Sequence, residues 1–596
     1  MCTLCGWAKA FSLGEGALPT RRDFVVAGVA AAGTAVTGAS ARAAGLRHHK
    51  ADFVFTNGVV YTVNPRQAWA EAVAVAGNTI VYVGENAGVT SYVGSRTRVI
   101  DLRGRMLLPG FVEGHIHPFA GAAIVRGVDL QYDSLDETLE ALRAYAKTNQ
   151  DRVVRGFGWR YNAFPPTGPR KEELDAIWPD RPAFLTAVDG HSAWVNSKAL
   201  QIAAITKATQ DPVPGFSYFE RDRQTREPTG YLVEVPAMVQ VLNVSEPITL
   251  DAVAAGLAQW LPRAAAAGIT AVFDAGIIVT PEEAAFGHYA DLENRGMLPF
   301  RVVGCHYHND PKVDPIPIIA ALRQKYHTEL VRASVLKLNI DGGDPQYTAA
   351  MLEPYSDKPD TRGELLLAPD LLKKIVREAD RAGIDLHCHS FGDRATRVTL
   401  DAIEEAVIVN GPRDRRHALA HLVYVNNDDI PRFAKLGIIA QFSAQWSVPD
   451  ASWSAVTKVR WGARADRMYP CGAIARSGAR IALGTDWPAA AYHSTYKPLD
   501  AIEVATTRRP LGKTDGAALP PAEERINLAQ ALHANTLGAA YQLRLDQETG
   551  SIETGKRADL VVLDQNLFRI TPHEIHYVTV AMTMMNGRFT HGQSGV

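Results

Sequence analysis

The middle of the chain alternates short apolar segments with longer amphipathic ones, and this alternation constrains the fold more than any other feature. The stretch 369–382 places its apolar residues at the spacing of one helix face. The short segments are rich in β-branched residues and include 183–188, 270–274, 335–338, 384–387 and 480–484. Strand–helix alternation over this length predicts an α/β fold with a parallel sheet, and a closed (β/α)8 TIM-like barrel fits it.

The chain of 596 residues is long enough for a barrel and a smaller companion domain. Residues 45–108 and 541–596 hold short β-type runs separated by Asn-Gly turns, and we expect both ends to pair into one small β-sandwich. The barrel is expected over 109–540. Residues from about 130 to 255 are too many for one connection and predict an inserted subdomain.

Residues 1–44 have the pattern of a signal peptide. Arg21 and Arg22 precede an apolar stretch from Phe24, which ends at the small-residue sequence Ala39-Ser40-Ala41. The paired arginines are typical of the twin-arginine signal, and the alternatives are an uncleaved anchor or a chance pair. We therefore expect a periplasmic or secreted protein, with no stable membrane span once the leader is removed.

Charge and composition argue against nucleic acid or an anionic membrane as a partner, and the expected partner is a small-molecule substrate. The net charge is -2, and no cluster of basic residues suggests nucleic acid as a partner. Of the five cysteines, Cys2 and Cys5 are expected to leave with the leader. Cys305, Cys388 and Cys471 show no disulfide framework and are expected to be buried thiols.

Two of the apolar segments carry residues suited to metal chemistry. His115 and His117 stand two positions apart, so on a strand both project to one side and can share a cation, although such a pair alone is weak evidence. Lys337 lies inside an apolar run, where burial favours the neutral amine. A neutral amine can add carbon dioxide and become a carbamate that bridges two metals. The alternative is a lysine that reaches solvent or pairs with Asp341.

Three further polar positions follow apolar runs. They are His387 with His389, His417 with His421, and Asp486. Each alone is as readily a core or surface group. Barrel active sites form at the carboxyl ends of the strands, so residues in these places are expected to meet there.

The order of these residues and their flanking sequence resemble the amidohydrolase superfamily, in particular the amidohydrolase family 3 group that includes N-substituted formamide deformylase. The resemblance spans nearly the whole chain after the leader. It rests on residues 108–118, 189–196, 228–234 and 550–560 together with the ordered set above.

The resemblance implies a role for each position. The implied metal ligands are His115, His117, His389 (rather than His387), His421 and Asp486, with Lys337 as a lysine that can be carboxylated. Zinc is the implied metal, as one or two ions. Asp486 is the implied general base, and His191 is a candidate for steadying the carbonyl oxygen, unless it is a structural histidine. Position 420 is Ala where the family usually has glutamate. A homodimer is also implied as a possibility.

The resemblance therefore predicts a metal-dependent hydrolase that cleaves a non-peptide amide bond with an activated water. Open alternatives are an ester or carbamate hydrolase, a heterocycle deaminase, and a non-catalytic exported binding protein. Residues 390–393 lack the glutamate that such deaminases carry after the third histidine. Five tryptophans fall in or near the expected active-face loops and favour an apolar or aromatic amide, unless they pack the insertion: Trp159, Trp194, Trp446, Trp453 and Trp487.

Overall fold

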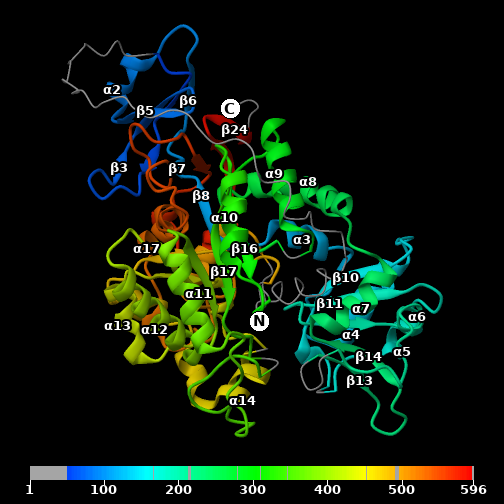
Figure 1. The fold of residues 1–596 in the computed structure, drawn as a ribbon. Helices are drawn as coiled ribbons and strands as arrows, with labels where there is room; N and C mark the ends of the chain where they lie inside the picture. Colours follow the sequence, from blue (N-terminus) through cyan, green and yellow to red (C-terminus); the bar gives the residue numbers. More distant parts are fainter. Residues whose placement is uncertain are drawn as a thin grey trace, which may run out of the picture.

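The structure is a computed structural model that describes residues 50–165, 167–212, 217–277, 279–308, 310–344, 347–451, 453–489 and 495–592. The predicted leader, with Cys2 and Cys5, lies outside these residues. Figure 1 shows a central barrel with one smaller unit on each side.

The barrel is an eight-stranded sheet in which every neighbouring pair is parallel, and this confirms the predicted TIM-like fold. Its first and last strands are joined by hydrogen bonds from the Asp486 amide to the His115 carbonyl (2.7 Å) and from the His117 amide to the Trp487 carbonyl (2.9 Å). In order around the sheet the strands are β8 (Phe111–Ile116), β15 (Ile269–Asp274), β16 (Arg301–His308), β17 (Val331–Asn339), β18 (Asp385–Ser390), β19 (Ala418–His421), β20 (Ile439–Phe442) and β21 (Ile481–Leu483).

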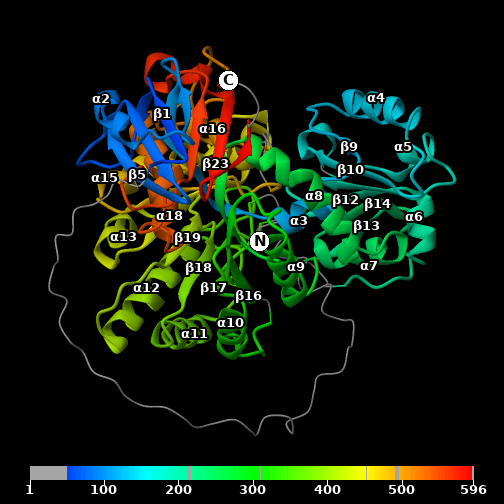
Figure 2. The ribbon, with the colours of Figure 1, turned by 90° about the horizontal axis from the view of Figure 1, so that it is seen from above.

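Helices cover the outside of the sheet (Figure 2). The predicted helix over 369–382 is α11, which buries Leu372, Ile375 and Val376 on one face. The main covering helices are α8 (Leu250–Ala266), α9 (Glu282–Asn294), α10 (Pro315–Lys325), α11 (Pro369–Arg381), α12 (Asp393–Asn410), α13 (Ile430–Leu436), α15 (Cys471–Arg476) and α16 (Pro498–Thr507). At the amino ends of the strands, α18 (Ala539–Gln542) contributes Ala539 and Ala540 to the apolar cluster inside the barrel.

A second sheet, which has six strands, lies beside the barrel (Figures 1 and 2). It shares an apolar cluster with the barrel helices, with Phe184 and Val235 on its side and Phe119 and Leu257 on theirs. Residues 183–188, which lie within the expected insertion, pair in this sheet with the strands that contain Arg155 and Val195. The strands are β9 (Val128–Asp129), β10 (Val154–Trp159), β11 (Ala183–Ala187), β12 (Ser192–Val195), β13 (Tyr218–Arg221) and β14 (Pro228–Val233), with helices α4 (Leu135–Ala146), α5 (Lys171–Asp175), α6 (Ser197–Ile202) and α7 (Val235–Ser245).

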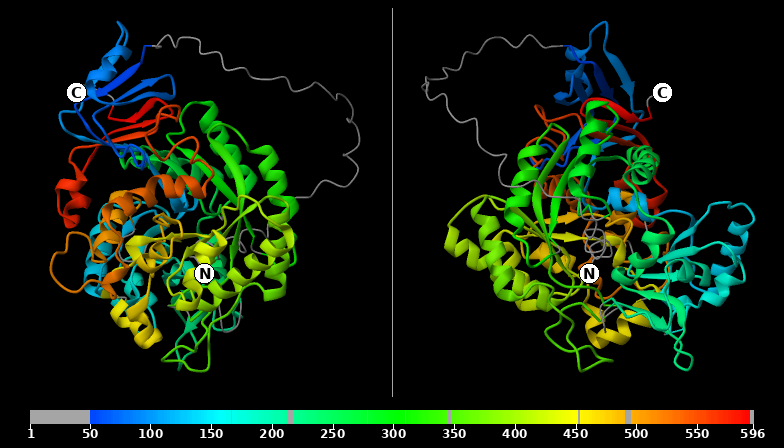
Figure 3. Two further views of the ribbon diagram at one scale, coloured as in Figure 1. Left: turned by 90° about the vertical axis from the view of Figure 1, so that its left-hand side faces the viewer. Right: turned by 45° about the vertical axis from the view of Figure 1, so that its right-hand side comes forward.

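Two further sheets lie on the other side of the barrel (Figure 3). One is built from residues before the barrel: β5 (Thr79–Gly84), β4 (Ala72–Ala76), β1 (Phe53–Thr56) and β6 (Arg98–Asp101). The other joins strands from both ends of the chain: β24 (Arg588–His591), β23 (Val580–Met585), β22 (Leu560–Leu563), β7 (Met106–Pro109), β2 (Val59–Tyr61) and β3 (Trp69–Ala70). Phe55 and Val73 of the first sheet share a buried cluster with Leu107 and Val562 of the second.

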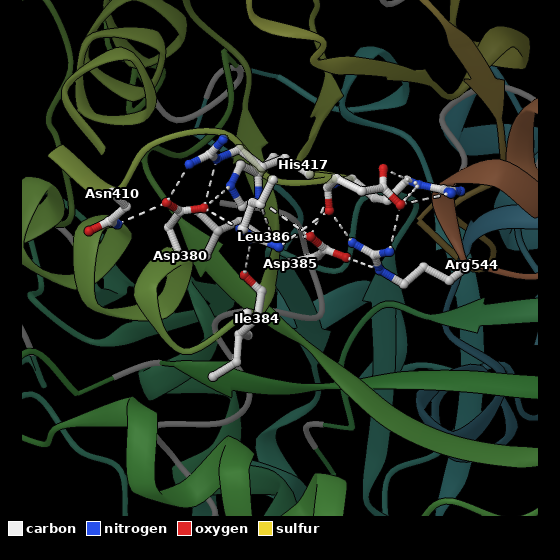
Figure 4. Close-up of polar contacts among 12 residues, drawn as sticks. Asp380, Ile384, Asp385, Leu386, Asn410, His417 and Arg544 are labelled. Atoms are coloured by element: carbon white, nitrogen blue, oxygen red, sulfur yellow. Dashed lines mark hydrogen bonds and ion pairs between the residues drawn. The ribbon is translucent and has the colours of Figure 1, made fainter. Parts of the chain in front are cut away.

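A network of acidic and basic side chains joins β18 and β19 at their amino ends (Figure 4). The buried Asp380 carboxylate accepts hydrogen bonds from Arg413 (2.6 Å), Arg415 (2.8 Å) and Asn410 (2.8 Å). His417 Nδ1 accepts from the Leu386 amide at 3.1 Å, so its Nε2 carries the proton and lies 3.5 Å from Asp380. Neighbouring strands are therefore tied together at this end.

Cys305, Cys388 and Cys471 are free thiols; the first two are buried, as predicted, whereas Cys471 is only partly buried. Among the described residues, no single helix is long and apolar enough to cross a membrane. The pair α7 and α8 passes that test only jointly, across a bend of 102°.

Candidate active site

The predicted site residues meet at the carboxyl ends of the barrel strands. His115 lies near the end of β8, His421 ends β19, and Asp486 follows β21 by three residues. One ligand atom from each of these three lies within 4.8 Å of the others, and all three side chains are buried. Residues far apart in sequence are thus assembled by the closed barrel into a group able to hold a metal ion.

His117 shows how well this group suits a cation. Its Nδ1 lies 3.3 Å from the Gly276 carbonyl, which can only accept, so Nδ1 carries the proton in a neutral ring. The unprotonated Nε2 of His117 then lies 3.1 Å from Asp486 Oδ1, and His115 Nε2 lies 3.3 Å from the same oxygen. Two imidazole nitrogens and a carboxylate oxygen therefore converge on one buried point, and this is a donor set that suits a metal cation.

His389 is prepared in the same way. Its Nδ1 donates to Asp341 Oδ1 at 3.1 Å, which leaves Nε2 free for a ligand. Asp341 also accepts from the backbone amides of Ala350, Phe391 and Gly392, so its position is fixed on four sides. Burial raises the pKa of Asp341 to about 7. The His389 ring lies 4.7 Å from that of His421, between centroids.

Lys337 is fully buried on β17, and its Nζ has no hydrogen-bond partner among the described residues. The alternative pairing with Asp341 is wrong, because the contacts of Asp341 are those given above. Burial lowers the pKa of His115, and the charge of Lys337 lowers it further, as it does for His421. Lys337 therefore lies close to the ligand group, and the neutral imidazoles are in the form that binds metal.

Several contributors at this site were not predicted from the sequence. His387, set aside as a ligand, places its Nε2 2.9 Å from His115 Nδ1. Glu113 accepts from the Thr485 amide (2.7 Å) and hydroxyl (2.9 Å), which fixes the loop that carries Asp486. The polar residue two positions before His115 and the one directly before Asp486 were the only sequence signals for this contact.

His191 comes from the inserted subdomain rather than from the barrel. Its Nδ1 lies 2.8 Å from Glu234 Oε2, and both side chains are buried. Burial alone would lower the pKa of His191, but the charge and hydrogen bond of Glu234 outweigh it and raise the pKa. Burial is the main cause that lowers the pKa of His389, and the charge of His191 is one of the smaller causes.

The five tryptophans divide into two groups. Trp159 and Trp194 are buried in the insertion, where their indole N–H groups donate to the carbonyls of Leu185 and Arg170. Trp487 stacks on Trp260 at 5.2 Å. These three pack the protein. Trp446 and Trp453 instead border a cluster that includes Phe391, two residues from His389.

The sequence and the fold are similar to those of known proteins. The model of the amidohydrolase family matches residues 98–591. The chain is 29% identical to Protein LONG AFTER FAR-RED 3 of Arabidopsis thaliana, over 87% of this chain and 88% of that one. It is 27% identical to N-substituted formamide deformylase of Arthrobacter pascens, over 91% and 99%. A metal-dependent hydrolase of Pyrococcus horikoshii shares the fold, with a TM-score of 0.67 at 22% identity over 87% of this chain and 99% of that one.

Proposed function

Because the chain belongs to the amidohydrolase family, a family of metal-dependent hydrolases of carbon–nitrogen bonds, we propose that it cleaves a non-peptide amide bond with zinc and a water molecule. The observation that carries the proposal is the convergence of His115, His117 and Asp486 on one buried point. Imidazole and carboxylate ligands in this number suit zinc.

The proposed ligands form two sets. His115, His117 and Asp486 would hold one ion, and His389 with His421 would hold a second, with a carboxylated Lys337 between them. The unpartnered atoms of Lys337 and His421 favour this arrangement, because a buried polar atom without a partner costs free energy that a ligand recovers. Bound zinc would acidify a water molecule and polarise the substrate carbonyl.

Two of the chain's own residues would move or hold protons. Asp486 would take the proton of the attacking water and deliver it to the leaving amine. His191, held by Glu234, would direct its Nε2 proton at the carbonyl oxygen as negative charge develops there. Burial opposes protonation of His191, but Glu234 outweighs it and raises the pKa of His191, which favours retention of that proton.

For the substrate we propose an apolar or aromatic amide. Trp446 and Phe391 stack on His421 and His389, Trp453 packs against the same aromatic cluster, and aromatic linings favour such molecules. For the location we propose the periplasm or the exterior, reached by the twin-arginine route. Fractionation of cells expressing the full chain tests this, with Arg21 and Arg22 both changed to Lys as the variant that should stay inside.

The direct test is a substrate screen with zinc-loaded protein, using N-acyl amines, N-acyl amino acids and aryl esters. We expect turnover of an N-acyl amine, lost on treatment with a chelator and restored by zinc. Turnover of esters alone would contradict the amide assignment. Turnover that survives complete metal removal would contradict the metal site.

A further inference from the structure

His421 is held differently from the other proposed ligands. His117, His389 and His115 each engage a carbonyl, a carboxylate or another imidazole through Nδ1. Neither nitrogen of His421 has a hydrogen-bond partner among the described residues, and its Nδ1 lies 3.8 Å from Asp486. The preceding residue, Ala420, offers no polar side chain.

An imidazole without a hydrogen bond is poorly fixed in orientation. The torsion about its Cβ–Cγ bond is broad, so the ring can turn away from the direction that a metal requires. The backbone of His421 is also strained, because its φ of 74° lies in the left-handed region that favours glycine. Some other contact must hold this ring for the site to be complete.

The indole of Trp446 provides that contact. It lies flat on the His421 ring, with centroids 5.0 Å apart and planes within 4° of parallel. Trp446 is itself fixed on the turn Ala444–Trp446: its amide donates to the Ser443 carbonyl, and its carbonyl accepts from the Val448 amide. The backbone of Trp446 is thereby held in place, and contact between the two ring faces favours the offset-stacked orientation of His421.

We propose that Trp446 is a positioning residue for the metal site, which fixes the His421 ring by stacking where no hydrogen bond does so. The inference rests on the proposed function, since it assigns His421 as a ligand. Trp446 also borders the aromatic cluster of Tyr347, Phe391 and Trp453, so the residue that steadies the ligand also lies against the proposed substrate wall. A substrate bound against this cluster would therefore lie next to the residue that orients His421.

The test measures zinc affinity rather than activity. Purified protein is stripped of metal and titrated with zinc against a chromophoric chelator, and the visible spectrum of the cobalt-substituted form reports coordination. Trp446→Leu removes the stack, and we expect zinc at the site of His421 to bind about tenfold more weakly, with a changed cobalt spectrum. Trp446→Phe keeps an aromatic face and should stay within about threefold of the parent.

Trp453→Leu is the matched control, because it removes a second partly buried indole from the same cluster without touching a ligand. It should leave both readouts unchanged. Thermal unfolding of the metal-free variants shows whether each has folded. Parent-like zinc affinity and spectrum in Trp446→Leu would overturn the proposal, as would equal losses in the Phe and Leu variants. Failure of the parent itself to bind zinc would instead reject the proposed function.

Discussion

The two ends of β18 and β19 carry polar groups of opposite kinds. At the amino ends, Asp380 is surrounded by arginine and amide donors (Figure 4). At the carboxyl ends, His421 and the nearby Lys337 are buried, and their side chains have no hydrogen-bond partner in the described part of the chain. Paired groups hold neighbouring strands together, whereas unpaired ones make a folded protein less stable unless a ligand joins them. The same pair of strands is thus built for stability at one end and for metal chemistry at the other.

The largest effect is expected at Asp486, which lies 3.8 Å from His421 at the carboxyl ends of the strands. We expect Asp486→Asn to lower kcat about a thousandfold, because the amide keeps the shape of the side chain but cannot accept the proton of water. Steady-state kinetics on the best amide from the screen measures it. Asp429→Asn, a buried aspartate on the outside of the barrel that pairs with Arg397 and Arg432, is the control and should keep kcat within about twofold. Parent-like turnover by Asp486→Asn would refute the general base.

Lys337 tests whether the unpaired groups serve metal binding at the expense of stability. Lys337→Met should lower activity about 100-fold and reduce the bound zinc from two ions to one. The same change should raise the melting temperature of the metal-free protein, because it removes a buried polar group without a partner. Carbon-13 spectra after incubation with labelled bicarbonate should show a carbamate signal in the parent alone. A parent without that signal would rule out carboxylation.

A smaller effect is expected at Glu234, which belongs to the insertion. Its charge raises the pKa of His191, so the activity that depends on protonated His191 is present at low pH and lost as pH rises through that pKa. Glu234→Gln should move this alkaline limb to lower pH and lower kcat about tenfold with little change in KM. Glu246→Gln, which removes the partner of Arg155, is the control. An unmoved alkaline limb would show that His191 does not act in catalysis.

At the amino ends of these strands, we expect a substitution to lower the free energy of unfolding without lowering the activity. Burial alone would raise the pKa of Asp380, but hydrogen bonds from His417, Arg415, Asn410 and Arg413 lower it. Its stabilising contribution is therefore complete above the unfolded pKa near 4 and is lost as pH falls below that. Asp380→Asn should cost about 3 kcal/mol in urea unfolding at pH 7 and less under acid.

The activity of folded Asp380→Asn should match the parent. Asp414→Asn, at an exposed aspartate of the same network, should cost under about 1 kcal/mol. A large drop in kcat for the folded Asp380 variant would mean that the two strand ends do not have separate roles.

The sequence predicted the barrel and the order of its polar strand ends because hydrophobic periodicity marks each strand directly. Periodicity does not say which sheet a strand joins: residues 183–188 have the same pattern as the barrel strands but pair in the insertion. The contacts of His387 with His115, Glu234 with His191 and Trp446 with His421 join residues that are distant in sequence. Each depends on how strands and loops meet in space, which local patterns do not encode.

The barrel closes where Asp486 and His117 exchange backbone hydrogen bonds with the opposite strand end, so the seam of the barrel and the ligand group coincide. His115 and Asp486 come from the first and last barrel strands, and the ribosome must have released nearly the whole domain before both can meet. The proposed metal would therefore find its full set of ligands only after Asp486 has emerged from the ribosome. A chain that ends before Asp486 has no complete site, so occupancy of the proposed metal site would report that the barrel has closed.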